Sequence, residues 1–337
     1  MFAAVAAVMT TLPAHSDTRL LDWADLSGWS KDDHAAALTV FQETCRDLDD
    51  GDWPVICKLS ETAGENPKIF FETYFRPVMI TDGEDALFTG YYEPELPGSR
   101  TRNAMYDVPL YRLPDDVPNT GPWLTREELS KTGVLENRGL ELVWLQNEVD
   151  KFFLQIQGSG RIRLEDGGLM RVGYGGKNGH PYRSIGQELV RRGEFQEHQV
   201  SAPVIRNWVE ANPERGSELL NHNPSYVFFR EVSQVDPAKG PLGAMNRSIT
   251  AGRSIAVDPE YVPLGAPVWV EKAGKRPFRK LMIAQDTGSA IKGAQRADVF
   301  YGSGDEAGRE AGRIRDGGRM IVLLPVASAM GMLNENQ

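Results

Sequence analysis

The feature that most constrains the fold is a series of short apolar segments after residue 240. These segments are rich in β-branched and aromatic residues, and Gly and Pro turns separate them: SIAVDPEYVPLGAPVWVE, RKLMIAQDTG, ADVFYG and RMIVLLP. Short strands at this spacing predict a small closed β-barrel. A similar apolar strand, residues 86–92, lies far earlier in the chain. We therefore predict a barrel into which a middle domain is inserted.

Helices are predicted at two places outside the barrel strands. Residues 20–80 are predicted to be helical, with one helix that Asp32 or Asp33 caps and a second helix over 66–75. The segments HPYRSIGQELVRRG and VIRNWVEANPE predict two more amphipathic helices, and Ser184 is the expected cap of the first.

The middle of the chain is predicted to contain paired strands. LELVWLQ, KFFLQIQGSGRIRLEDG and SYVFFREV are the expected strands. In the second of these, Phe153, Gln155 and Gln157 alternate with apolar residues, which is typical of a half-buried strand. The glycines at 158–160 predict a hairpin turn.

These patterns predict a mainly β protein of the α+β class. We expect a catalytic barrel domain with N-terminal helices, formed by residues 17–100 and 236–337, and an inserted substrate-groove domain over 101–235. Residues 1–16 are interpreted as a possible signal peptide, because a short apolar run precedes small residues spaced like a signal-peptidase site. A frayed helix is the alternative, since the run lacks a basic start.

Charge and cysteine content bound the environment of the protein. The 337 residues have a formal net charge of −10, which argues against nucleic-acid binding. Because no run of ~18 apolar residues is present, stable membrane insertion is not expected. Cys45 and Cys57 fit either one disulfide in an oxidising compartment or two buried thiols.

Several classes of chemistry lack their sequence signature. The five histidines are scattered, and with two distant cysteines they show no zinc-ligand spacing, so we expect no metal. No P-loop, no dinucleotide-binding glycine motif and no GxSxG elbow is present, so neither a cofactor nor a serine nucleophile is expected. Acid–base catalysis by carboxylates on a polar, uncharged substrate is the remaining class, and glycoside cleavage is its leading case.

The candidate carboxylates are Asp258, Asp286 and Asp298, each of which lies in or directly after a strand-like segment. A carboxyl group beside apolar walls and a second carboxylate has a raised pKa, as a general acid near neutral pH requires. Asp258 and Asp286 have turn-forming neighbours and could simply make turns. Asp298 has no such neighbour, so a catalytic role is favoured there.

Aromatic and amide side chains could hold a sugar. Tyrosines in Gly- or Pro-rich contexts offer flat faces for sugar rings, and amide groups offer partners for hydroxyls. Lys292 and Arg296 could meet substrate carboxylates or be solvated surface charges. The predicted substrate-binding set is Thr89, Tyr91, Tyr92, Gln155, Gln157, Ser159, Tyr174, Asp258 and Lys292.

Long motifs resemble the family of membrane-bound lytic murein transglycosylase A (MltA). They are FTGYYEPEL, FFLQIQGSGRIRLEDG, VGYGGKNGHPYRSIGQELVRRGE, NPSYVFFRE, AGRSIAVDPEYVPLGAPVWVE and AQDTGSAIKGAQRADVFYGSGDEAGREAG. The last of these also resembles the three-aspartate (3D) domain. The resemblance implies a double-psi β-barrel with a second, smaller inserted β-domain, and a groove that holds a glycan strand.

The resemblance also implies a reaction and a location. The family cleaves the β-1,4 bond between N-acetylmuramic acid and N-acetylglucosamine of peptidoglycan without water, and forms 1,6-anhydro ends. The position of the family's catalytic aspartate is Asp298 here, and Asp286 matches a supporting position. Peptidoglycan strands are the implied partner and the periplasm the implied compartment. The chain departs from the family in Ala297, where an aromatic residue is frequent, and in lacking a cysteine for lipid attachment.

Two alternatives from other classes remain at this stage. One is an inverting endoglycanase, with Asp298 as the acid and Asp286 or Asp258 as the base. The other is a non-catalytic glycan-binding module, since one fold can carry several functions. The end groups of the product distinguish the endoglycanase from a lytic transglycosylase. An absence of cleavage would favour the binding module.

Overall fold

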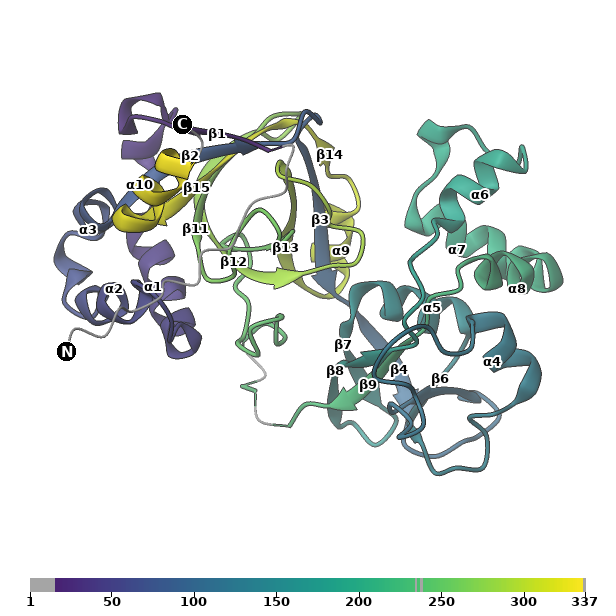
Figure 1. Ribbon diagram of the computed structural model, residues 1–337. Coiled ribbons are helices and arrows are strands. Elements are labelled where there is room, and N and C mark those ends of the chain that lie inside the picture. Colours follow the sequence, from purple (N-terminus) through teal and green to yellow (C-terminus); the bar gives the residue numbers. More distant parts are fainter. Residues whose placement is uncertain (1–15, 234, 237–238, 336–337) are drawn as a thin grey trace. The chain divides into compact units, whose positions relative to one another are not determined.

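The computed structural model describes residues 16–233, 235–236 and 239–335, and the proposed signal peptide lies almost wholly outside them. Two compact units are present. Unit 1 comprises residues up to Tyr91, Leu242–Gly302 and residues from Arg313, and unit 2 comprises Tyr92–Pro241 and Ser303–Gly312. Each contains its own sheet, so the predicted α+β class is confirmed (Figure 1).

Unit 1 is built on a nine-stranded sheet that curls around its own core (Figure 1). The strand order is β1-β2-β15-β11-β12-β10-β13-β3-β14. The strands are β1 (Asp17–Leu20), β2 (Phe75–Thr81), β3 (Leu87–Glu93), β10 (Ser254–Val257), β11 (Pro267–Lys272), β12 (Phe278–Thr287), β13 (Arg296–Ser303), β14 (Arg315–Asp316) and β15 (Gly318–Pro325). The predicted strands after residue 240 are therefore present, and the strand predicted at 86–92 pairs among them.

The apolar side chains of these strands pack into two hydrophobic cores, one on each face of the sheet. In β15, Met320, Val322 and Leu324 point into the curled sheet, whereas Ile321 and Leu323 point to its outside. Side chains alternate between the faces of a strand, so a strand buried on both faces has a nearly continuous apolar sequence.

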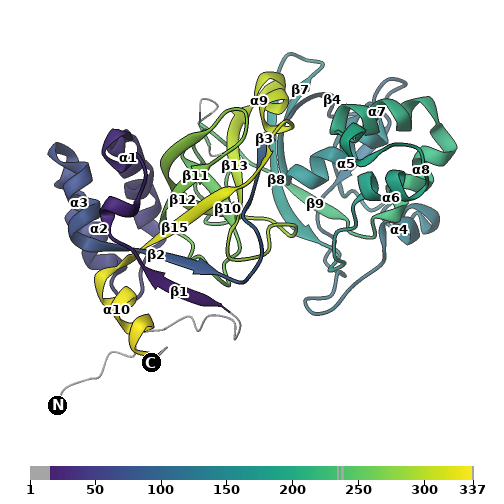
Figure 2. The same cartoon turned by 90° about the horizontal axis from the view of Figure 1, so that it is seen from above.

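Helices cover the outer face of this sheet, as Figure 2 shows from above. They are α1 (His34–Thr44), α2 (Trp53–Ser60) and α3 (Pro67–Tyr74), and α10 (Val326–Glu335) follows β15. The predicted cap is confirmed for α1, because the Asp33 carboxylate accepts a hydrogen bond from the Ala36 N–H at 3.0 Å. The prediction that 20–80 is helical throughout is wrong at its ends, where β1 and β2 pair with each other.

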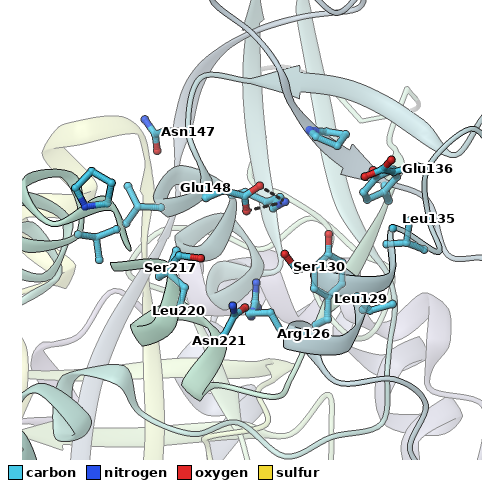
Figure 3. A pocket seen from close by; sticks show the side chains of 18 of the residues that line it. Arg126, Leu129, Ser130, Leu135, Glu136, Asn147, Glu148, Ser217, Leu220 and Asn221 are labelled. Carbon is cyan, nitrogen blue, oxygen red and sulfur yellow. Dashed lines mark hydrogen bonds and ion pairs between the residues drawn. The ribbon is translucent and has the colours of Figure 1, made fainter. Parts of the chain in front are cut away.

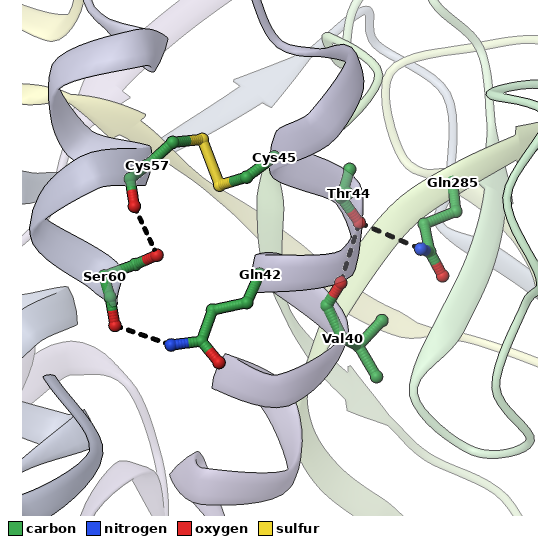
Figure 4. The surroundings of a disulfide bond; sticks show 7 residues. All are labelled: Val40, Gln42, Thr44, Cys45, Cys57, Ser60 and Gln285. Carbon is green, nitrogen blue, oxygen red and sulfur yellow. Dashed lines mark hydrogen bonds between the residues drawn. A yellow bond between two sulfur atoms is a disulfide. The ribbon is translucent and has the colours of Figure 1, made fainter. Parts of the chain in front are cut away.

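A disulfide joins the end of α1 to α2 (Figure 4). Cys45 and Cys57 are bonded, with their Cα atoms 5.4 Å apart. The predicted disulfide is thus confirmed over the alternative of two thiols. Beside it, the Thr44 hydroxyl donates to the Val40 carbonyl at 2.8 Å and accepts from the Gln285 amide at 2.9 Å, which ties α1 to β12.

Removal of this bond is expected to destabilise the protein. The disulfide closes a loop with a sequence separation of 12, and a crosslink of this span limits the freedom of the unfolded chain. We expect the double change Cys45→Ala and Cys57→Ala to lower the free energy of unfolding by about 3 kcal/mol, measured by urea unfolding. Reduction of the wild-type protein should produce the same loss; equal stability of oxidised and reduced protein would contradict the prediction.

Unit 2 contains a six-stranded sheet with the order β5-β6-β4-β7-β8-β9. The strands are β4 (Glu95–Ser99), β5 (Val108–Tyr111), β6 (Glu141–Leu145), β7 (Ser159–Leu164), β8 (Leu169–Lys177) and β9 (Val227–Glu231). The helices of this unit are α4 (Arg126–Thr132), α5 (Glu148–Gln157), α6 (Ile185–Arg191), α7 (Ala202–Ala211), α8 (Pro213–His222) and α9 (Gly304–Ala311). The predicted Ser184 cap of α6 is confirmed by its bond to the Gln187 N–H.

One secondary-structure prediction in unit 2 is wrong. Residues 151–157 form most of helix α5 instead of a strand. Asn147 caps the helix by accepting the Asp150 N–H at 2.8 Å, and Gly158 ends it in the left-handed conformation with a φ of 77°. The glycines at 158–160 therefore make no hairpin turn. The apolar residues at helical spacing begin at Val149, whereas the strand prediction used only the residues from Lys151 onward.

Candidate active site

The candidate acids are brought together around strand β10. Ala256 of β10 pairs with Asp286 of β12 on one side and with Asp298 of β13 on the other. Because neighbouring strands are about 4.8 Å apart, the Cα atoms of these two aspartates are separated by roughly 10 Å. Residues paired in register point to the same face of a sheet, so both carboxylates lie on the face of the Ala256 side chain. Asp258 follows directly after β10.

The carboxylate of Asp298 is hydrogen-bonded through only one of its oxygens among the described residues. The Thr89 hydroxyl of the neighbouring strand β3 donates to Oδ1 of Asp298 at 2.7 Å. The other oxygen, Oδ2, has no hydrogen-bond partner among the residues that the structure describes. The side chain is partly exposed, so a proton on Oδ2 is available to a ligand.

The surroundings of Asp298 favour its protonated form. Burial raises the pKa of Asp298, while the Thr89 hydrogen bond and the charge of Arg296 pull it in the opposite direction. The net shift is upward, as the sequence analysis predicted. A carboxylic acid that retains its proton toward neutral pH can act as a general acid.

Arg296 fixes the direction of the Thr89 hydroxyl. Its Nη2 donates to the Thr89 oxygen at 2.8 Å, and its Nη1 donates to the carbonyls of Leu87 and Ala297. A hydroxyl has one proton, so Thr89, which accepts from Arg296, directs that proton to Asp298. The side chain is half-buried and its Nη1 and Nη2 bind protein groups, so Arg296 is not a freely solvated surface charge. Arg296 and Asp298 are two residues apart on a strand, so their side chains point to the same face, and this spacing could have predicted that Arg296 lies beside the acid.

Asp286 is held by three donors. The Tyr91 hydroxyl donates to Oδ2 at 2.9 Å, and the N–H groups of Ala244 and Thr287 each donate to Oδ1 at 2.9 Å. Gly243 permits this approach, because a Cβ at that position would lie 2.6 Å from the Gln285 carbonyl oxygen. Both oxygens of Asp286 are therefore occupied by protein groups.

Burial raises the pKa of Asp286 to about 6, although its three hydrogen bonds lower it. The charge of Asp298 adds a smaller upward contribution. From the sequence, apolar walls and a second carboxylate were both expected to raise the pKa of the catalytic acid. Burial is the main cause for both carboxyls, and like-charge repulsion acts on Asp286. The aromatic rings of Tyr91 and Phe300, with centroids 5.3 Å apart, supply part of the apolar wall.

Asp286 is expected to make folding pH-dependent. Its pKa is raised in the folded protein from 3.8 to about 6, so its contribution to stability is complete below pH ~4 and is lost as the pH rises through ~6. A shift of this size corresponds to at most about 3 kcal/mol. We expect Asp286→Asn to unfold at a higher urea concentration than the wild type at pH 8, and to lose that advantage at pH 4. A constant difference between the two proteins over this range would refute the prediction.

Asp258 and Lys292 brace the loop between β12 and β13. Lys292 donates to Oδ1 of the buried Asp258 at 3.0 Å, and the Gly293 N–H donates to Oδ2 at 3.0 Å. Both oxygens of Asp258 are thus used to hold the loop. Lys292 is largely exposed and also lies 3.8 Å from Glu260.

The other predicted site residues lie in unit 2. The Tyr92 N–H donates to the Gln157 side chain at 3.2 Å, and Tyr174 of β8 is 51% exposed. Ser159 is buried on β7. Gln155 is buried in α5 and donates to the Val227 carbonyl at 2.8 Å, so we assign it a structural role instead of sugar binding.

Comparisons with known proteins place the chain in a family. Residues 87–230 match the model of the MltA specific insert domain, and residues 253–324 match that of the 3D domain. The fold resembles the crystal structure of membrane-bound lytic murein transglycosylase from Agrobacterium tumefaciens, with a TM-score of 0.83 and 30% identity over 94% of this chain and 99% of that one. The chain belongs to the MltA family. Its predicted resemblance to that family is therefore confirmed.

Two further relatives of the family are similar to this chain. The membrane-bound lytic murein transglycosylase A of Escherichia coli (strain K12) is 37% identical over 246 residues, which cover 70% of this chain and 65% of the relative. The match thus spans slightly less than two thirds of that relative. The crystal structure of E. coli MltA with bound chitohexaose has a TM-score of 0.74 at 29% identity, and covers 91% of this chain and 94% of that chain.

The described residues show neither a metal-binding cluster nor a membrane-spanning helix. Residues 16–233, 235–236 and 239–335 contain no cluster of three or more His, Cys, Asp or Glu that could hold a metal ion. None of the helices in these ranges combines the length and the apolar character needed to cross a bilayer.

Proposed function

We propose that this chain is a peptidoglycan lytic transglycosylase with Asp298 as its single acid and base. The substrate is a glycan strand, and the bond cleaved joins N-acetylmuramic acid to N-acetylglucosamine. The observation that carries the proposal is the environment of Asp298, which has a raised pKa and one carboxyl oxygen that no described residue binds. The names of the E. coli and A. tumefaciens relatives state lytic murein transglycosylase, and the E. coli relative binds chitohexaose.

In the first step Asp298 acts as an acid. Thr89 donates to Oδ1, so the proton of the neutral carboxyl resides on Oδ2. This proton passes to the glycosidic oxygen as the bond from that oxygen to the anomeric carbon breaks. N-acetylglucosamine leaves with a new hydroxyl group, and Asp298 becomes ionised.

In the second step the same carboxylate acts as a base. It takes the proton of the C6 hydroxyl of N-acetylmuramic acid, and that oxygen bonds to the anomeric carbon of its own ring. The attacking group is tethered, so its effective concentration is high and no water is needed. Asp298 regains its proton and the product carries a 1,6-anhydro bond. The Thr89 hydrogen bond stabilises the ionised form between the two steps.

This mechanism needs no second catalytic carboxylate. A glycosidase requires one carboxylate as acid and another as nucleophile or as the base that activates water. Here Asp286 receives three hydrogen bonds, and Asp258 receives an ammonium and an N–H. Both carboxylates therefore hold the loops beside Asp298. This favours an auxiliary role for Asp286, and it disfavours the inverting mechanism, which needs one of them as a base.

The residues that the sequence predicted to bind substrate are proposed to contact the glycan, except Gln155 and Asp258. In unit 1 these are Thr89, Tyr91 and Lys292. In unit 2, Tyr92, Gln157 and Ser159 are retained from the sequence prediction, and Tyr174, with half of its surface exposed, is proposed to stack on a sugar ring.

We further propose that the protein acts in the periplasm. The disulfide between Cys45 and Cys57 supports an oxidising compartment, because such bonds are rare where thiols are kept reduced. Peptidoglycan strands are the proposed partner there.

Digestion of purified peptidoglycan tests the proposed function directly. The products should carry anhydro ends when examined by mass spectrometry. Reaction in water enriched in oxygen-18 should leave the new ends unlabelled, since no water enters the product. Labelled reducing ends would identify a hydrolase, and intact glycan would leave only the binding module.

A further inference from the structure

A cavity of about 440 Å³ lies within unit 2, and none of the residues that line it is assigned to the reaction (Figure 3). Its walls come mainly from β5, α4, α5, α7 and α8. The floor contains two cationic side chains, Arg126 of α4 and Lys151 of α5, which are each only 6% exposed. Tyr226 lies against both, with its ring centroid 5.1 Å from the Arg126 guanidinium and 6.0 Å from the Lys151 ammonium.

Only one of these two cations has a carboxylate partner among the described residues. Lys151 Nζ lies 2.7 Å from a carboxylate oxygen of Glu148, and 56% of the Glu148 side chain is exposed. Dashed lines in Figure 3 mark the interactions of Glu148. Arg126 forms no ion pair with any residue that the structure describes; it donates to the carbonyls of Asn223 and Ser225. Buried charges are normally paired. The floor of the cavity therefore holds one uncompensated positive charge.

The mouth of the cavity has the opposite charge. Glu136 and Glu210 are exposed lining residues, and neither forms an ion pair with a described residue. Apolar side chains of Leu129, Leu135 and Leu220 complete the wall. A volume of this size accommodates a small molecule. A dianion such as phosphate would be repelled at the mouth, whereas a monoanion with a positive group at its other end complements both regions.

We propose that this cavity binds the carboxylate end of a short peptide. The carboxylate contacts Arg126 and Lys151, the small side chains lie against the leucines and Tyr226, and the amino group faces Glu136 and Glu210. The site belongs entirely to unit 2 and goes beyond the proposed reaction.

The test is isothermal titration of the full chain with the dipeptide D-alanyl-D-alanine. Saturable binding of one dipeptide molecule per chain is expected. Titration with L-alanyl-L-alanine shows whether the site distinguishes the two configurations. The C-terminal amide of the same dipeptide removes the negative charge, and should bind roughly tenfold more weakly or worse, since it loses charge-assisted hydrogen bonds. The N-acetylated dipeptide removes the positive charge and should also bind more weakly. No binding of either free dipeptide, or equal binding of acid and amide, overturns the proposal.

Two variants locate the binding. Lys151→Met removes one buried cation while keeping the length of the side chain, and should weaken binding at least about tenfold; Lys131→Met, at a 70% exposed side chain of α4, is its matched control. Ser217→Trp, at an exposed helical position that lines the cavity, fills the space without changing charge, and Ser217→Ala is its control. Thermal unfolding verifies that each variant folds.

The pattern of results decides the question. Loss in Lys151→Met and Ser217→Trp with both controls unaffected supports the site. Undiminished binding in these two variants places the dipeptide elsewhere and overturns it. Asp298→Asn should bind the dipeptide as the wild type does, and a loss there would also overturn the proposal, because it would indicate binding at the reaction site. Turnover is not measured in any of these arms, so the outcome is independent of the proposed reaction.

Discussion

Replacement of Asp298 by asparagine is expected to reduce the formation of anhydro products by roughly a thousandfold or more, since both proton transfers depend on this one carboxyl. Asparagine has almost the same shape, and can still accept the hydrogen bond from Thr89. Burial penalises the ionised aspartate, so the neutral amide should fold at least as stably at neutral pH. The rate is measured by quantifying anhydro-muropeptides released from purified peptidoglycan.

Binding separates a catalytic role from a structural one. Asp298→Asn should sediment with insoluble peptidoglycan as the wild type does. Asp49→Asn, at an exposed position, is the matched control and should keep full activity. Near-normal turnover by Asp298→Asn would show that another group carries the proton.

Replacement of Thr89 by valine has the second largest expected effect. The change removes the only hydrogen bond that the described residues give to the carboxylate of Asp298, and leaves Arg296 without the hydroxyl to which it donates. A hydrogen bond to an ionised group contributes about 1.5–3 kcal/mol, so kcat should fall roughly tenfold to a hundredfold. The Thr89 bond lowers the pKa of Asp298. Its loss should raise that pKa and move the alkaline limb of the pH–rate profile to higher pH.

The shift of the pH profile distinguishes this role from simple packing. Thr89→Ser retains the hydroxyl, and should restore both the rate and the position of the alkaline limb. Thr120→Val, in an exposed loop, should change neither. A fall in rate with an unmoved pH profile in Thr89→Val would mean that the hydroxyl does not act on Asp298.

The barrel strands could be predicted because their signal is local. Residues 318–325 form a nearly continuous apolar run that only a strand buried on both faces explains well, and β15 is such a strand. The helix α5 could not be predicted from its last seven residues. Their apolar pattern fits a short strand as well as a helix, and the deciding cap, Asn147, lies outside that window.

The candidate acids could be chosen from the sequence, but their separate roles could not. Asp286 and Asp298 both follow apolar residues on strands. What distinguishes them is that Ala244, Thr287 and Tyr91 donate to both oxygens of Asp286, whereas within the described part of the chain only one oxygen of Asp298 has a hydrogen-bond donor. Two of these donors come from segments remote in sequence, and no local pattern shows where a remote N–H or hydroxyl will point.

The same limit applies to the cavity of unit 2. Arg126 and Lys151 lie on different helices, and in the sequence each resembles an ordinary surface charge. Their burial follows from the packing of α4, α5 and α8 around Tyr226.

Apolar periodicity, turn residues and helix caps depend on near neighbours in the chain, so the residues alone specified the strands of the barrel, the caps of α1 and α6, and the family motifs around Asp298. The state of the acids depended on long-range contacts. Burial and hydrogen bonds from distant strands determine that Asp298 can donate a proton and that Asp286 is fixed by protein donors. Those contacts exist only after β3, β10, β12 and β13 have paired, because desolvation and hydrogen bonding act through space over a few ångströms and are independent of distance along the chain.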